Sequence, residues 1–99
     1  MNQLRIKDWD EYQHYKPVHP KYQKKMRWFK FYGRDLLDDS KWASLKPEVQ
    51  VTLVMLWSLA SQYEGNLPDI KTIAFRLRRD EAFIVEALDL LKDWVVKLE

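Results

Sequence analysis

Few residues of this chain have the types and spacings that catalysis needs. Its only histidines, His14 and His19, lack the His-x-x-x-His spacing that places two metal ligands on one face of a helix. Its only glycines are Gly33 and Gly65, so there is no glycine-rich loop to hold a phosphate. The acidic pair at 38–39 is expected on a short exposed helix, where carboxylates more often act as surface charge than as an acid/base pair. We therefore expect no enzyme activity, no metal site and no cofactor.

Basic residues carry a clearer chemical signal, which is phosphate binding. Residues 70–79 contain no Asp or Glu and hold four cations, namely Lys71, Arg76, Arg78 and Arg79. A second group lies in a proline- and lysine-rich stretch and comprises Lys21, Lys24, Lys25 and Arg27. Lysine and arginine neutralise phosphates, and the aromatic residues interleaved with the second group could stack on unpaired bases. Both groups are candidates for contact with a nucleic-acid backbone.

Two short amphipathic helices are expected to carry the first basic group and the residues that follow it. Asp69 and Asp80 are the expected N-caps, since an Asp side chain accepts hydrogen bonds from the free amides of a first helical turn. The apolar spacing in the two segments predicts two buried faces, formed by Ile70, Ile73, Ala74 and Leu77 and by Ile84, Ala87, Leu88, Leu91 and Trp94. Two such helices around a tight turn predict a helix-turn-helix.

The outward face of the second helix is not suited to reading DNA bases. We expect it to comprise Ala82, Phe83, Glu86, Asp89, Leu90 and Asp93. Base reading in the major groove needs Arg, Lys, Asn or Gln, whereas carboxylates repel phosphates. An apolar face flanked by acids suits a protein partner instead, through Phe83, Glu86 and Leu90. Alternatively, Phe83 is covered by the N-terminal part of the chain.

The remaining elements predict a mainly α fold with short β strands. A core helix from Pro47 to about Tyr63, apolar all round near its middle, is followed by Gly65 as a left-handed cap. Strands are expected near 4–7, at 27–32, at 66–68 and from 95 onward, with a turn or short helix from Asp8. A short helix at 34–40 is expected to bury Leu36 and Leu37, with Trp42 and Leu45 beneath it. The order helix, strand, helix, helix, strand is that of a winged helix-turn-helix, with its second wing strand missing or supplied by 27–32.

Composition and length bound the class of protein. The chain has 99 residues, which predicts one domain, and it contains no cysteine and no apolar run long enough to span a membrane. Residues 1–34 carry nine basic and three acidic residues, a net charge of +6, whereas 35–99 carry eight and twelve, a net charge of −4. We divide the chain into a basic N-terminal arm (1–26), a winged helix domain (27–97) and Leu98-Glu99, interpreted as a cloning scar on an N-terminal piece of a longer protein.

Three sequence blocks resemble a group of phage and prophage proteins. They are Ile6–Lys16 (IKDWDEYQHYK), Trp28–Asp39 (WFKFYGRDLLDD) and Leu67–Arg78 (LPDIKTIAFRLR), and they occur in the same order. The second block also resembles the N-terminal domain of phage replisome organisers and DnaD-like primosome proteins. The chain departs from the pattern at Gly33, an added residue, and in a longer, more basic stretch at 18–26.

The resemblance implies a winged helix fold and a DNA-associated, non-catalytic role in phage or prophage replication initiation, in the cytoplasm of a bacterial host. We expect DNA as the partner and phosphate contacts as the main mode of binding. One alternative is a protein-interaction or oligomerisation module of a primosome-like assembly, with replication proteins or a second copy as partner. Another is a phage transcriptional regulator, which would need a base-reading helix.

Overall fold

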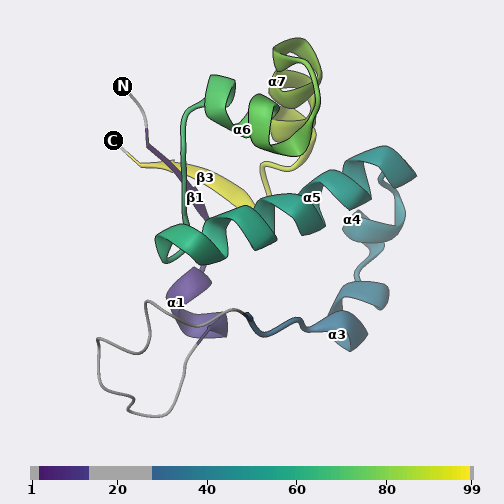
Figure 1. The fold of residues 1–99 in the computed structure, drawn as a ribbon. Helices are drawn as coiled ribbons and strands as arrows, with labels where there is room; N and C mark the ends of the chain where they lie inside the picture. The colour runs from purple at the N-terminus through teal and green to yellow at the C-terminus, as the bar shows by residue number, and fades with distance from the viewer. Residues whose placement is uncertain (1–2, 14–27, 99) are drawn as a thin grey trace, which may run out of the picture.

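The computed structural model describes residues 3–13 and 28–98, which form a mainly helical domain with a three-stranded antiparallel sheet (Figure 1). Its helices are α1 (Trp9–Tyr12), α3 (Gly33–Leu37), α4 (Ser40–Ala43), α5 (Pro47–Ala60), the 3-10 turn η1 (Ser61–Tyr63), α6 (Ile70–Leu77) and α7 (Glu81–Leu90). Its strands are β1 (Gln3–Ile6), β2 (Asn66–Leu67) and β3 (Val95–Leu98). In Figure 1, α6 and α7 lie on one side of α5, and α3 lies on the other.

The N-terminal strand β1 is the middle strand of the sheet, whose order is β2-β1-β3. Leu4 pairs with Leu67 on one edge, and Ile6 pairs with Val95 on the other. The pairing continues beyond the strands, because the Lys7 amide donates to the Trp94 carbonyl at 2.8 Å. The short strand expected near 4–7 is confirmed, and it belongs to the sheet beside the helix pair.

The expectation of a strand at 27–32 is wrong for the described residues of that stretch. Residues 28–32 contain no helix or strand, and the Gln13 side chain binds their backbone in place of a neighbouring strand. The Gln13 Nε2 donates to the Lys30 carbonyl at 2.7 Å, and the Lys30 amide donates to the Gln13 Oε1 at 2.6 Å. This stretch therefore does not supply the second wing strand, and the strand between β2 and β3 is β1.

The long helix α5 supplies the centre of the hydrophobic core, as expected. It begins at Pro47, whose missing N–H is harmless in a first turn, and it buries Leu53 and Leu56 completely. The prediction that the apolar run at 53–57 is buried on most sides is confirmed, because Leu53 and Leu56 are fully buried and Val54 and Trp57 are half-buried. Met55, at 38% exposure, is the exposed member of this run.

The α6–α7 pair forms as predicted, with both caps and both apolar faces in place. The Thr72 amide donates to Asp69 Oδ1 at 2.7 Å, and the Phe83 amide donates to Asp80 Oδ1 at 2.8 Å. These bonds satisfy first-turn amides that have no partner within the helix. The residues that the two helices bury are Ile73, Ala74, Leu77, Ile84 and Ala87, and Leu91 is buried directly after α7.

The chain reverses after η1 through two residues with positive φ, Glu64 at 56° and Gly65 at 95°. The Gly65 amide donates to the Ala60 carbonyl at 2.9 Å, which ends the helical segment as the sequence predicted. Gly65 also lies directly against Trp9. A Cβ at this position would be 2.4 Å from the Trp9 Cγ, so the close packing of α1 on this turn requires glycine.

The stretch before α5 forms two short helices, α3 and α4, where one was expected. Asp39 caps α4 by accepting the Lys41 amide at 2.8 Å. Leu37 is 78% exposed, so its predicted burial is wrong; neighbouring residues of an α-helix point about 100° apart, and Leu36 is the one that is half-buried. Trp42 and Leu45 do pack against the core, as expected.

None of the helices in the described residues has the length and apolar character that a membrane span requires.

Candidate nucleic-acid interface

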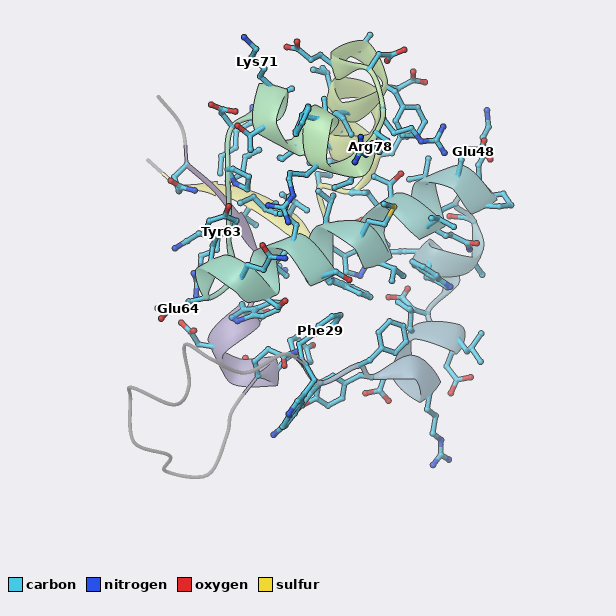
Figure 2. The ribbon with its side chains drawn as sticks, in the orientation of Figure 1. Phe29, Glu48, Tyr63, Glu64, Lys71 and Arg78 are labelled. Atoms are coloured by element: carbon cyan, nitrogen blue, oxygen red, sulfur yellow. The ribbon has the colours of Figure 1, made fainter. Side chains whose placement is uncertain are left out.

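The four cations predicted on the first helix and the turn are all exposed. Because α6 turns Ile73, Ala74 and Leu77 inward, Lys71 and Arg76 remain on its outer surface. Arg78 adopts a left-handed conformation with φ 60° that ends α6, and the Arg79 amide then donates to the Ala74 carbonyl at 3.0 Å. Lys71 and Arg78 lie at opposite ends of α6 (Figure 2), so the positive charge extends along the whole helix.

None of these four side chains forms an ion pair with a described residue. The ion pairs among the described residues are Arg5–Asp10 and Lys41–Asp93, and neither involves α6 or the turn. Arg76 Nη2 donates one hydrogen bond to the neutral side-chain oxygen Oε1 of Gln62 at 3.1 Å. The charges on α6 and the turn are therefore not neutralised by these residues and are available to an anion.

Aromatic rings orient the two arginines of the turn. The Arg78 guanidinium carbon Cζ lies 5.9 Å from the Phe75 ring centroid, and that of Arg79 lies 4.7 Å from the Phe83 centroid. A guanidinium over a ring face gains cation–π attraction. Its N–H groups lie in its plane and can still donate to a phosphate in the paired geometry that arginine favours. This arrangement restricts the two side chains before any ligand binds.

The outer face of α7 differs from its prediction at one aromatic residue. Phe83 was expected to point outward but is only partly exposed, since it packs against the core and under Arg79. Leu90 and Glu86 are exposed as expected, and Val85, which the sequence analysis did not select, is 53% exposed. The face is thus apolar and acidic, and it offers no cation for the major groove.

Sequence reasoning also missed Phe75, which directly precedes Arg76 on α6 and is 72% exposed. The signal was present in the inward spacing of Ile73, Ala74 and Leu77, which leaves position 75 on the outer surface. The same reasoning applied to Ile84 and Ala87 would have selected Val85.

The second predicted basic group cannot be placed. Its residues, Lys21, Lys24, Lys25 and Arg27, lie outside the described part of the chain, as do His14 and His19. Trp28, which follows directly, is described and is 56% exposed. The geometry of the candidate interface therefore comes from α6, the turn and α7 alone.

Hydrogen bonds favour the charged form of one carboxylate near Lys71, that of Asp69. Hydrogen bonds from Thr72, first from its side chain and then from its amide, lower the pKa of Asp69 below its ordinary value of 3.8, and the charge of Lys71 acts in the same direction. The described residues contain no group of three or more His, Cys, Asp or Glu that could hold a metal ion. The charged groups that this surface exposes include the four cations of α6 and the turn, and a cation attracts an anion.

Comparisons with protein-family models, with curated proteins and with solved structures found no match for the chain.

Proposed function

We propose that this chain is a non-catalytic DNA-binding domain that contacts phosphates through α6 and the turn that follows it. The observation that carries the proposal is the set of four exposed cations on this unit, none of them ion-paired with a described residue. Phosphate contacts of this kind supply affinity and orientation without base recognition. The acidic and apolar outer face of α7 is consistent with binding through phosphates, because it carries none of the Arg, Lys, Asn or Gln side chains that pair with purine edges.

A winged helix-turn-helix is the fold that we propose for this unit. The support is the chain order α5, β2, α6, α7, β3, together with an antiparallel sheet that joins β2 and β3 through a third strand. In this proposal β1 occupies the place of the second wing strand. The winged helix would then be completed by the N-terminal end of the chain rather than by a hairpin after α7.

A role in phage or prophage replication initiation, in the cytoplasm of a bacterial host, is the biological setting that we propose. Its support is the resemblance of the three sequence blocks at 6–16, 28–39 and 67–78. The last block contains Lys71, Arg76 and Arg78, so the resemblance and the charge coincide on α6.

A second candidate is a protein-interaction or oligomerisation module. It is favoured by the exposure of Val85 (53%) and Leu90 (47%) on the same helix as the exposed Glu86. In this reading α7 docks on a replication protein or on a second copy, and the cations of α6 contribute solubility. Size-exclusion chromatography with light scattering, with and without DNA, separates the two readings, since the DNA-binding reading requires a complex with DNA.

The salt dependence of DNA binding tests the leading proposal. Each phosphate contact contributes about 0.9 to the slope of log affinity against log salt on duplex DNA. The double variant Arg78→Ala/Arg79→Ala should bind more weakly at low salt and should show a slope shallower by about 2. The matched control Lys46→Ala/Lys92→Ala removes the same charge from exposed positions outside α6 and the turn. An Arg78/Arg79 variant that binds no differently from this control would contradict the proposal.

A further inference from the structure

A cavity of about 280 Å³ lies on the side of α5 away from α6 and α7, between α5, α1 and the segment 28–32. Its volume is close to the lower end of the range for small-molecule sites, roughly 300–1,000 Å³. Phe29, which lines it, is labelled in Figure 2 below α5, whereas Lys71 and Arg78 lie above this helix. The cavity is therefore separate from the candidate DNA interface.

Aromatic side chains from four parts of the described chain line this cavity, namely α1, segment 28–32, α5 and the turn after α7. Besides Phe29 they include Trp9, Tyr12, Phe31, Tyr32, Trp57 and Trp94. Several rings stand at large angles to one another, whereas Trp57 also stacks on Trp42, outside the lining, at an interplanar angle of 13°. The Phe31 and Trp57 rings are 5.7 Å apart at 77°, and the Tyr12 and Tyr32 rings are 5.2 Å apart at 63°. A ring face that is open to the cavity attracts a cationic group through its quadrupole.

Hydrogen bonds hold the walls of the cavity in place without a ligand. The two bonds between the Gln13 amide and the Lys30 backbone fasten segment 28–32 to α1. The Tyr32 hydroxyl donates to the Tyr12 carbonyl at 2.6 Å, which makes a third link between the same two elements. Gln13 is 8% exposed, so this junction is part of the folded domain. A preformed wall lowers the ordering cost of binding.

The charges around the cavity favour a cation over an anion. Among the described lining residues there are four carboxylates, from Asp8, Asp35, Asp39 and Asp93, and three amines, from Lys7, Lys30 and Lys41. The Lys41 amine lies 3.7 Å from Asp93 Oδ1, so one amine is already paired with a carboxylate. Asp35 is in no ion pair with a described residue. A phosphate-bearing ligand would meet a net negative lining.

We propose that this cavity binds an organic cation, an alkylammonium or guanidinium group, by cation–π attraction to its rings and by charge attraction to Asp35. The face of an aromatic ring carries the negative part of its quadrupole, and cages of several rings recognise ammonium groups in this way. A divalent metal is disfavoured, because the described carboxylates include no group of three that could hold one. The cation comes either from a free amine or from a Lys or Arg side chain of a protein partner.

Tryptophan fluorescence of the whole chain tests this proposal, because Trp9, Trp57 and Trp94 line the cavity. Choline should change the emission in a saturable way, and its neutral isostere 3,3-dimethyl-1-butanol should bind at least about tenfold more weakly. Phe31→Leu keeps an apolar side chain but removes the ring, and it should weaken choline binding by about 2- to 30-fold, which is the range of one cation–π contact. Asp35→Asn should weaken choline binding and leave the alcohol unaffected.

A matched control is Phe75→Leu, which removes an exposed ring on α6, outside the cavity, and should leave choline binding unchanged. Competition by putrescine or by N-acetyl-lysine amide distinguishes a free amine from a protein side chain as the natural source. No saturable response to any of these cations, equal binding of the alcohol, or an unchanged affinity in both Phe31→Leu and Asp35→Asn would overturn the proposal. These titrations contain no DNA, so they can fail while the proposed DNA binding holds.

Discussion

Replacing Gly65 with alanine should destabilise the domain strongly, because two independent features of the structure require glycine there. The backbone has φ 95°, a conformation that residues with a Cβ rarely adopt. The added Cβ would also lie 2.4 Å from Trp9 Cγ, 2.6 Å from Cδ1 and 2.7 Å from Cβ, all far inside contact distance. Trp9 is only 8% exposed, so the indole has little room to move.

The magnitude follows from adding these two costs. A residue held in a sparsely populated backbone region costs about 1–3 kcal/mol. Overpacking a filled site costs about another 1–3 kcal/mol. The alanine also stiffens the unfolded chain, which returns about 0.4–1 kcal/mol. The net loss for Gly65→Ala is about 1–5.6 kcal/mol, or a fall in Tm of at least about 4 °C for a domain of this size.

Thermal unfolding followed by circular dichroism measures this loss, and Gly33→Ala is the matched control. Gly33 has no positive φ, and its added Cβ would lie 3.2 Å from the end of the Phe31 side chain, so its Tm should change little. Trp9→Leu/Gly65→Ala should lose less stability than the sum of its single variants, since the smaller side chain relieves the overlap. A Gly65→Ala variant whose Tm lies within about 2 °C of the parent would refute the reasoning.

Two further predictions concern the core and one helix cap. Leu56→Ala, at a fully buried position in α5, should lower the free energy of unfolding measured in urea by about 2–5 kcal/mol. Leu37→Ala, at a position that is 78% exposed, should lower it by less than about 0.5 kcal/mol. Equal losses in the two variants would contradict the described core. In the folded chain the pKa of Asp69 lies below 3.8, its ordinary value in the unfolded chain. The stability that this charged N-cap contributes is therefore fully present above pH 3.8, and it is lost as the pH falls through the lower pKa of the folded chain. The difference in Tm between the parent and Asp69→Asn should therefore shrink below about pH 4, and a difference that widens on acidification would exclude this role for the carboxylate.

The α6–α7 pair could be predicted from the sequence because its determinants are local. Asp69 and Asp80 precede apolar residues at helical spacing, and both the caps and the buried faces form as that pattern indicates. The exposure of Arg78 and Arg79 followed from the same spacing. Their stacking over Phe75 and Phe83 did not, because it depends on how the turn orients each side chain.

The role of β1 could not be predicted, because strand pairing is a long-range property. Residues 3–6 pair with residues 66–67 and 95–98, which are about 60 and 90 residues away in the sequence. The local sequence of β1 does not specify these partners. The aromatic stretch at 28–32 has the composition of a strand, yet Gln13 binds its backbone and no strand pairs with it. The cavity depends on this same junction, so it also lay beyond the sequence pattern.

The most direct test of the central claim is the salt dependence of binding to a duplex oligonucleotide, measured for the parent chain and for Arg78→Ala/Arg79→Ala. The account predicts that the parent affinity falls steeply with salt and that the variant binds more weakly, with a slope shallower by about 2. The control Lys46→Ala/Lys92→Ala should stay close to the parent. No measurable binding of the parent at low salt, or the same slope in the parent and the Arg78/Arg79 variant, would contradict it.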